Sequence, residues 1–412
     1  MELEKFSSKK IKITVDYYDD AHRNLLNSTS RYDQYFIDNM KKIISEGVEV
    51  TGAEYLINSL VFKQHTNPEK YTQRNDLMSA ISSATQYFID DLEISNNSLR
   101  VPANSNPEAA IVMKRVGESI GLSVVSRIIG VNEADWTVIP ELGVKAFDFR
   151  YAATTKGIVQ VETKGTHSID ISKKNNNIYS HASSINDKKN EMSTNSKHPY
   201  PGDYNYGTIA FCPKGGNKNL KCYLLDPPSG SSRERLAEAI LAKKLGFYYR
   251  FMNFISPDSK LINLLHERTL AFADGKLNLN TAKKLDYYGT SKSGDFDESF
   301  FLNKKTIKLN GLRVSGDWFH LKKNYIVFIG IKNSIINDIV LQSNEKLSQL
   351  KYETFSHNKE IIFNIQTGYQ KQQLKRLQEE NGNIYNSKVL KTKGNITLLA
   401  SGVAIGILKV MD

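Results

Sequence analysis

The sequence has few of the features that mark secreted or membrane-bound proteins. Its two cysteines, Cys212 and Cys222, form neither a disulfide framework nor a metal motif with closely spaced histidines. The first residues lack an apolar signal core. The longest apolar run, residues 398–408, is interrupted by a serine and two glycines and is too short to cross a bilayer. We therefore expect a protein of the reducing cytoplasm with no membrane segment.

Charge and length indicate the kind of partner and the number of domains. The chain has 412 residues, of which 40% are hydrophobic, a length typical of two or three domains with substantial cores. Lysine and arginine exceed aspartate and glutamate by 55 to 44, which gives a net charge of +11. Residues 143–222 alone hold twelve basic and six acidic residues. This imbalance favours a polyanionic partner such as nucleic acid, although many ordinary soluble proteins are equally basic.

Two strand-like stretches, on either side of the turn at residues 152–157, carry the most informative polar residues. Successive side chains of a strand point to opposite faces, so Asp148 shares a face with Arg150. In the second stretch Gln160, Glu162 and Lys164 share a face, and the valines between them face the core. The short polar turn predicts a hairpin that brings Asp148 beside Glu162.

These residue types suit metal-dependent hydrolysis of a phosphodiester. Mg²⁺ prefers hard oxygen ligands and usually keeps several waters beside one or two carboxylates, which Asp148 and Glu162 would supply. Mn²⁺ is an alternative ion. Lys164 would orient the attacking water or stabilise the anionic transition state. The alternative is a surface hairpin with an ordinary cross-strand ion pair, because Glu-x-Lys occurs often by chance.

The run resembles the signature of the PD-(D/E)XK nuclease superfamily, an aspartate at the end of one strand followed by Glu-x-Lys on the next. The matching residues are Asp148 and Glu162-Thr163-Lys164, and Phe147 stands where the family usually has proline. The resemblance implies a restriction-endonuclease-like α/β core with a mixed sheet, in the order helix, three strands, helix, strand. In many members a glutamate of the first helix faces the metal. Glu118 is the best match, with Glu108 as the alternative.

The flanking sequence predicts elements in that order. Residues 106–120 have helical apolar spacing, begin with Asn-Pro and stop at a glycine, and residues 122–129 are typical of a strand. After the two motif strands, residues 170–192 are predicted to be helical in part. Residues 206–212 and 221–226 are predicted to form a hairpin. Further candidates for nucleic-acid contact around the motif are Gln160, His167, Ser168, His181, Lys188 and Lys189.

The resemblance covers only residues 105–230, so the rest of the chain is divided by its own patterns. Residues 1–100 are expected to be mainly helical after a short strand at 11–15, with helices near 35–44 and 76–90. Residues 101–230 form the expected nuclease core. A break rich in proline and serine near residue 226 precedes a C-terminal α/β domain, 231–412, for recognition or partner binding. Its expected elements are a helix from residue 233, a strand at 324–331, a helix at 369–381 and strands at 395–410.

The hypothesis drawn from these patterns is a Mg²⁺-dependent nuclease, with DNA favoured over RNA. By analogy with the family, its role would be restriction or anti-phage defence in a prokaryote. Rival hypotheses are a repair or recombination nuclease for branched or damaged DNA, a binding module that has lost catalysis, and an interaction protein whose basic face is incidental. The sequence contains no Walker loop, Gly-x-Ser-x-Gly elbow or methyltransferase-type glycine cluster. A partner ATPase would therefore supply any motor, and a homodimer would suit cutting of both strands.

Overall fold

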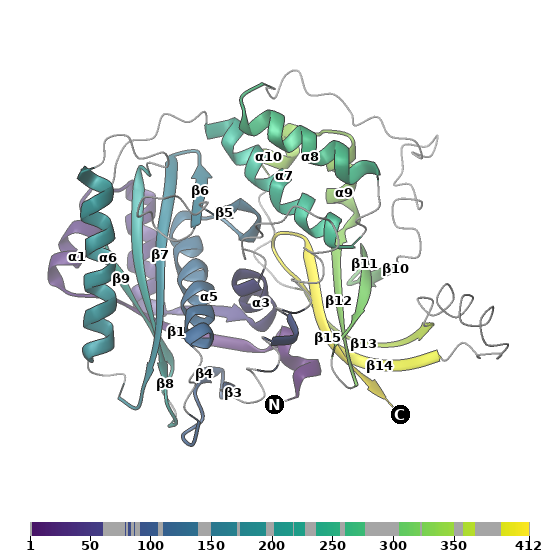
Figure 1. The fold of residues 1–412 in the computed structure, drawn as a ribbon, viewed down its shortest axis with the longest axis horizontal. Helices are drawn as coiled ribbons and strands as arrows, with labels where there is room; N and C mark the ends of the chain where they lie inside the picture. Colours follow the sequence, from purple (N-terminus) through teal and green to yellow (C-terminus); the bar gives the residue numbers. More distant parts are fainter. Residues whose placement is uncertain are drawn as a thin grey trace.

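The chain is a mixed α/β protein with two principal sheets (Figure 1). The computed structural model describes residues 2–60, 79, 81–83, 86, 91–105, 110–138, 150–170, 174–194, 202–216, 218–226, 236–255, 260–276, 305–321, 324–349, 357–366 and 389–411. The predicted helices at 76–90 and 369–381 lie wholly or mostly outside these residues.

The larger sheet has seven strands in the order β2-β1-β9-β8-β7-β6-β5. The β7–β8 and β1–β9 pairs are parallel and the others are antiparallel. The strands are β1 (Lys10–Tyr17), β2 (Val48–Thr51), β5 (Trp136–Val138), β6 (Arg150–Thr154), β7 (Gly157–Ser168), β8 (Tyr204–Pro213) and β9 (Leu220–Leu225). The predicted strand at 11–15 and the predicted β8–β9 hairpin are confirmed. Because β1 and β2 belong to this sheet, it crosses the boundary expected near residue 100.

Helices cover both faces of this sheet. Helix α5 (Ala110–Ile129) packs on one face and α6 (Asn176–Thr194) on the other (Figure 1). The remaining elements of this half are η1 (Leu3–Ser8), α1 (Asp20–Leu26), α2 (Gln34–Glu46), α3 (Gly52–Leu60), β3 (Glu93–Ser95), β4 (Ser98–Arg100) and η2 (Glu133–Asp135). The predicted helix at 35–44 is confirmed by α2, and the partly helical stretch at 170–192 by α6.

The predicted strand at 122–129 is wrong, because these residues form the second half of α5. Its β-branched residues suit a strand, but this part of α5 is buried except at Arg127, with Leu122, Val124 and Val125 all fully buried. Gly121 does not end the helix. A Cβ at this position would lie 2.7 Å from Thr163 Cγ2, so glycine allows α5 to pack closely on β7.

The second sheet has six antiparallel strands in the order β10-β11-β12-β15-β14-β13. The strands are β10 (Lys305–Leu309), β11 (Leu312–His320), β12 (Tyr325–Lys332), β13 (His357–Gln366), β14 (Val389–Leu398) and β15 (Val403–Met411). Its helices are α7 (Leu236–Ile255), α8 (Lys260–Ala273), α9 (Asn333–Val340) and α10 (Asn344–Gln349). The strands predicted at 324–331 and 395–410 are confirmed. The helix predicted from residue 233 is confirmed by α7 over its described residues, and residues 233–235 lie outside them.

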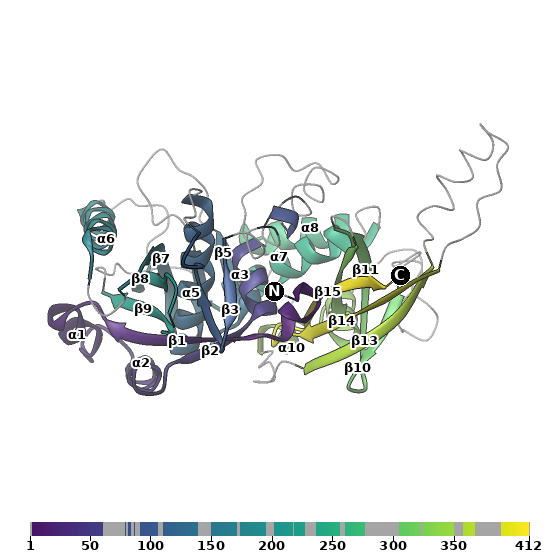
Figure 2. The ribbon, with the colours of Figure 1, turned by 90° about the horizontal axis from the view of Figure 1, so that it is seen from below.

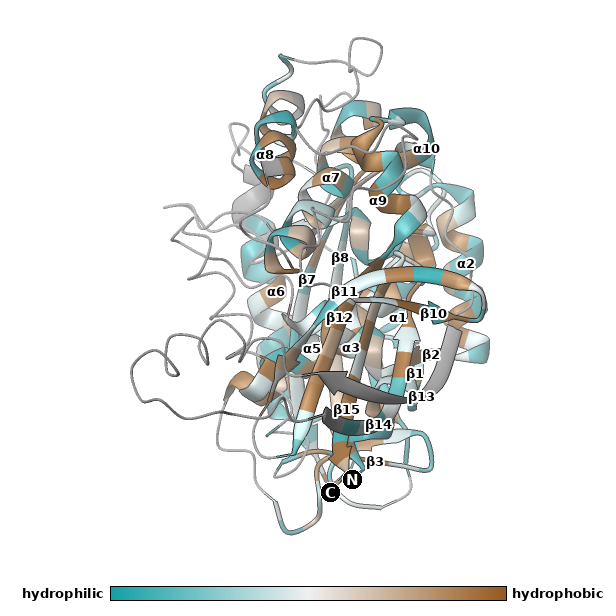
Figure 3. Cartoon of the chain, turned by 90° about the vertical axis from the view of Figure 1, so that its right-hand side faces the viewer, coloured by the Kyte–Doolittle hydropathy of each residue, from teal (hydrophilic) through white to brown (hydrophobic). Residues whose placement is uncertain are grey.

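The two halves are joined by packing and by the N-terminal segment. One hydrophobic core includes residues of α5 and β7 as well as α7, β12 and β15. In Figure 3 hydrophobic residues follow β12, whereas α10 at the rim is largely hydrophilic. The N-terminal η1 lies beside β14 and β15 (Figure 2), and Ser7 Oγ donates a hydrogen bond to the Asn395 carbonyl at 2.6 Å.

Candidate functional site

Strand β7 presents Gln160, Glu162 and Lys164 on the face covered by α6. Thr163, between the last two, lies against Gly121 of α5 on the opposite face. Glu162 instead contacts Lys188, which belongs to α6. The alternation predicted for this strand is therefore confirmed, and Glu162 and Lys164 lie side by side.

The Glu162 carboxylate is fully buried and contacts two lysines. Its Oε1 lies 2.8 Å from Lys164 Nζ and 3.0 Å from Lys188 Nζ. The side chains of Lys164 and Lys188 are only 20% and 15% exposed. Moving an ionised carboxylate out of water costs several kcal/mol unless opposite charges and hydrogen bonds compensate. These two ammonium groups provide such compensation.

Helix α6 brings Lys188 and His181 to β7. Its apolar side chains Ile178, Ala182 and Ile185 form a small core with residues of β8 and β9. Positions 181 and 188 are seven residues apart, so they lie on the same side of the helix. A hydrogen bond to the Gly165 backbone holds His181, and burial lowers the pKa of this imidazole, with a further lowering by the charge of Lys164.

A glycine on β8 makes this close packing possible. Gly207 is the β8 residue in register with Glu162. A Cβ on Gly207 would lie 2.9 Å from Ile185 Cγ2 and 3.1 Å from Leu225 Cβ. Both contacts are shorter than real Cβ atoms normally make, so a side chain here would displace α6 from β7. The position of Lys188 over Glu162 thus depends on this glycine.

The β6–β7 hairpin is present as predicted, with a turn between Thr154 and Gly157. Asp148 lies outside the described residues. Strand β6 begins at Arg150, which pairs with Val161, and directly opposed residues of an antiparallel pair share a face. Arg150 is therefore on the Val161 face, opposite to Glu162, and this differs from the hairpin expected from the sequence.

Glu118 is on the other side of the sheet from Glu162. It belongs to α5, which packs on the Thr163 face of β7. Its Oε2 lies 3.3 Å from Arg115 Nη1, and both side chains are largely buried. The structure therefore does not bring Glu118 to the carboxylate of Glu162. Glu108, the alternative candidate, lies outside the described residues.

The other candidates for nucleic-acid contact are divided between the two faces. His167 follows Thr163 and Gly165 on the α5 face, and its pKa is lowered by burial and then by the charge of Lys214. Ser168 ends β7, and its carbonyl accepts a hydrogen bond from the Lys214 backbone N–H at 2.7 Å. Lys189 follows Lys188 on α6, but its side chain is outside the described part. Of the predicted residues, the structure gathers Glu162, Lys164, His181 and Lys188, with Gln160 on the same face.

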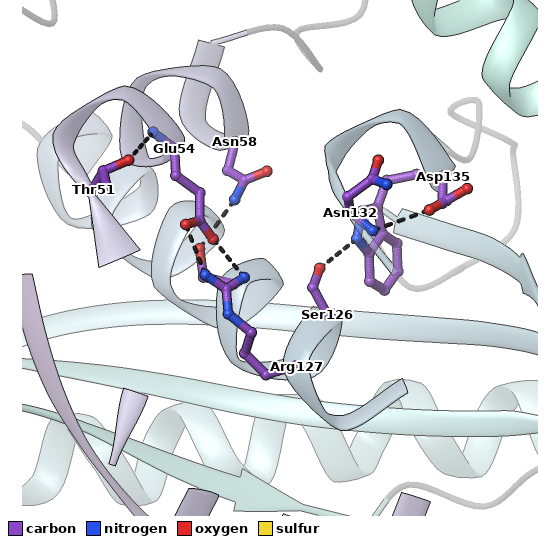
Figure 4. A network of polar contacts seen from close by, with 9 residues as sticks. Thr51, Glu54, Asn58, Ser126, Arg127, Asn132 and Asp135 are labelled. Carbon is purple, nitrogen blue, oxygen red and sulfur yellow. Dashed lines mark hydrogen bonds and ion pairs between the residues drawn. The ribbon is translucent and has the colours of Figure 1, made fainter. Parts of the chain in front are cut away.

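A second polar network, largely buried, was not predicted from the sequence (Figure 4). Arg127 of α5 donates two hydrogen bonds, each 2.8 Å long, to the two carboxylate oxygens of Glu54 on α3. Nearby, Trp136 Nε1 donates to Ser126 Oγ at 2.8 Å. No local spacing signals the Glu54–Arg127 pair, because the two residues are 73 positions apart.

This network continues to the second half of the molecule through η2. Asp135 Oδ1 lies 3.3 Å from Nζ of Lys244 on α7. Glu133, also in η2, is buried near Glu54 and close to Ser401, between β14 and β15. Burial, and next the negative charge of Glu54, raise the pKa of Glu133 to about 7.

Comparisons of the chain with protein-family models, curated proteins and solved structures found no match. Among the described residues no group of three or more histidine, cysteine, aspartate or glutamate side chains is arranged to hold a metal ion. No helix in the described part is long and apolar enough to span a membrane.

Proposed function

We propose that this chain is a metal-dependent nuclease whose site is built on Glu162 and Lys164 of β7. The observation that carries the proposal is the fully buried Glu162 carboxylate, paired with Lys164 and Lys188 at the edge of a β hairpin. A buried carboxylate is costly, and such groups are concentrated at functional sites. Two lysines beside it suit a phosphate-containing substrate.

The order of the elements supports the same proposal. Helix α5 is followed by the antiparallel strands β5, β6 and β7, then by α6, and then by β8 parallel to β7. This is the order of helix, three strands, helix and strand that is typical of the PD-(D/E)XK core. Glu162-Thr163-Lys164 stands on the third of these strands, where the family has its Glu-x-Lys.

The described residues provide one of the carboxylate ligands that a hard divalent cation requires. Glu162 offers a carboxylate, and Mg²⁺ needs only one or two protein carboxylates because it keeps several waters. Asp148 is the second ligand that the proposal requires. Because Arg150 lies on the face opposite to Glu162, the proposal also requires that strand alternation is broken between positions 148 and 150, so that the Asp148 carboxylate can reach Glu162. When bound, Mg²⁺ or Mn²⁺ would lower the pKa of a coordinated water and neutralise charge on the phosphate.

The lysines and the imidazole then have separate tasks. Lys164 would donate to the reacting phosphate or orient the attacking water, where a positive charge stabilises the developing anion. Lys188, which lies beside Glu162, would contact an oxygen of a neighbouring phosphate. His181 links α6 to β7 through its hydrogen bond to the Gly165 backbone, next to Lys164.

The biological setting belongs to the proposal as well. A prokaryotic endonuclease for DNA in restriction or anti-phage defence suits the basic charge and the family resemblance, with a nuclease for branched or damaged DNA as the alternative. A homodimer or a partner ATPase would complete such an enzyme.

One observation favours a second candidate, a nucleic-acid-binding module without catalysis. Glu162 is already compensated by two lysines, so this triad would also serve as a buried structural ion cluster. The two candidates are separated by incubating the full chain with supercoiled, linear and single-stranded DNA and with RNA, in Mg²⁺, Mn²⁺ or chelator. We expect cleavage that requires the metal and is lost in Glu162→Gln. Salt-dependent binding without cleavage under any condition would favour the binding module.

A further inference from the structure

Two ammonium groups share one oxygen of Glu162. Lys164 belongs to the same strand, two residues along, whereas Lys188 comes from α6. Both Nζ atoms lie within 3.0 Å of Oε1. These three groups together carry one positive charge in excess, in a place that is mostly shielded from water.

A divalent cation on Glu162 would add two further positive charges to this cluster. Like charges repel strongly when water does not screen them. A cation that takes Oε1 as a ligand would therefore be opposed by the ammonium of Lys188, which lies 3.0 Å from that oxygen. A phosphate group that binds together with the metal would reduce this repulsion, because it gives the Lys188 ammonium another anionic partner.

The two lysines differ in how readily they can change partner. Lys164 lies two residues from Glu162 on β7, so it stays beside the carboxylate whether or not a ligand is bound. Lys188 projects from α6 on a flexible four-carbon stem, and its helix is held independently by Ile178, Ala182 and Ile185. Its ammonium can move to a phosphate without disturbing the helix.

We propose that Lys188 couples metal binding to nucleic-acid binding, on the assumption that the proposed nuclease function is correct. Without nucleic acid, Lys188 occupies Glu162 Oε1 and weakens binding of the metal. With nucleic acid, it contacts a backbone phosphate, and the metal then binds to Glu162 more tightly. Such coupling is reciprocal, so the metal strengthens nucleic-acid binding by the same factor. Lys188 therefore keeps metal binding at Glu162 weak until a nucleic-acid substrate is present.

The test is a calorimetric titration of Mn²⁺ into the full chain, with and without a saturating duplex whose phosphorothioate linkages resist hydrolysis. In the wild type we expect the duplex to tighten Mn²⁺ binding about tenfold, within the usual range of coupling between sites. In Lys188→Met we expect Mn²⁺ alone to bind about tenfold more tightly than in the wild type, and the effect of the duplex to be largely lost. Lys188→Arg keeps the charge and should keep the coupling.

Lys174→Met is the matched control, because it removes the same charge from a lysine just before α6. Its Nζ lies 3.9 Å above the Tyr18 ring, away from Glu162. It should leave the Mn²⁺ affinity and the effect of the duplex unchanged. If Lys188→Met does not fold, as judged by its thermal transition, Lys188→Gln provides a neutral polar substitute for the same titration.

The outcomes separate this inference from the proposed function. A wild-type chain that binds no Mn²⁺ with or without the duplex overturns both. A wild type that binds Mn²⁺, with unchanged affinities in Lys188→Met, overturns the role of Lys188 alone. Weaker Mn²⁺ binding in the folded Lys188→Met or Lys188→Gln variant would likewise overturn the coupling, because it would show that Lys188 only holds Glu162 in place.

Discussion

Glu54 and Arg127 form a two-point ion pair that joins α3 to α5, with both N–O distances 2.8 Å (Figure 4). The Glu54 side chain is 8% exposed and that of Arg127 is 38% exposed. The planar guanidinium matches the carboxylate with two parallel hydrogen bonds, which lysine cannot reproduce. The pair therefore fixes the two helices in angle as well as in distance.

Removing one partner of this pair should destabilise the protein clearly. We expect Glu54→Ala to lower the free energy of unfolding by about 2 kcal/mol, less than for a completely buried pair because water reaches Arg127. Urea unfolding would measure it. Glu49→Ala is the control, since its pair with Lys10 is 2.7 Å long but well exposed, and it should cost less than about 1 kcal/mol. Equal losses in the two variants would contradict the assigned importance of the Glu54–Arg127 pair.

Stability should also depend on pH through Glu133. Burial and then Glu54 raise the pKa of this carboxyl to about 7, from 4.5 for an unperturbed glutamate. Between these values the folded protein binds more protons than the unfolded chain, so the contribution of Glu133 to stability falls as pH rises towards 7.

Glu133→Gln should therefore match the wild type near pH 5 and exceed its stability at pH 8, by on the order of 2 kcal/mol. The glutamine resembles the neutral carboxyl in size, which limits changes in packing. Thermal unfolding of both proteins across pH 5–8 would measure the difference. A difference that does not change with pH would show that Glu133 does not titrate in this range.

The packing of α6 on β7 gives a prediction that does not depend on any activity. Gly207→Ala puts a Cβ 2.9 Å from Ile185 Cγ2, and we expect it to lower the free energy of unfolding by about 1–3 kcal/mol. In α7, Gly246→Ala makes only an ordinary contact, 3.7 Å from Thr269 Cγ2, and should be neutral or stabilising by up to about 1 kcal/mol. Chemical denaturation would compare the two. A stable Gly207→Ala protein would show that α6 can move aside at little cost.

Sequence patterns predicted those parts of the structure that depend on near neighbours. Alternation placed Glu162 and Lys164 on one face of β7, and helical spacing located α2 and α7. Such patterns failed for residues 122–129, because nearly all of this part of α5 is buried, which leaves only Arg127 of the polar face by which a helix is recognised.

Contacts between distant segments could not be predicted in this way. Lys188 was a candidate for nucleic-acid contact, but its position beside Glu162 depends on how α6 crosses β7, 26 residues away in the chain. The pairing of β1 with β9 likewise joins segments about two hundred residues apart and brings N-terminal strands into the sheet. Register and crossing angle are set by packing of the whole fold, which local periodicity does not describe.

Loss of a proposed metal ligand should separate cleavage from binding. We expect Glu162→Ala and Asp148→Ala to reduce cleavage by orders of magnitude, because charge stabilisation by the metal is lost. In the presence of chelator, DNA affinity should hold or rise, since a carboxylate that repels phosphate is gone. Cleavage rates and filter binding at one salt concentration would measure both effects. Wild-type cleavage by either variant would show that the assigned residue is not a ligand.

Lys164 allows the role of charge to be tested apart from metal binding. Lys164→Met keeps most of the volume of the stem and removes the ammonium, so the loss of packing should be small. The ammonium is proposed to act on the phosphate or the water and is not needed to hold the ion. We therefore expect cleavage to be lost while the thermal transition and calorimetric Mn²⁺ binding persist. If Mn²⁺ binding disappears, or if cleavage falls only in proportion to the folded fraction, the Lys164–Glu162 pair at 2.8 Å has a structural role.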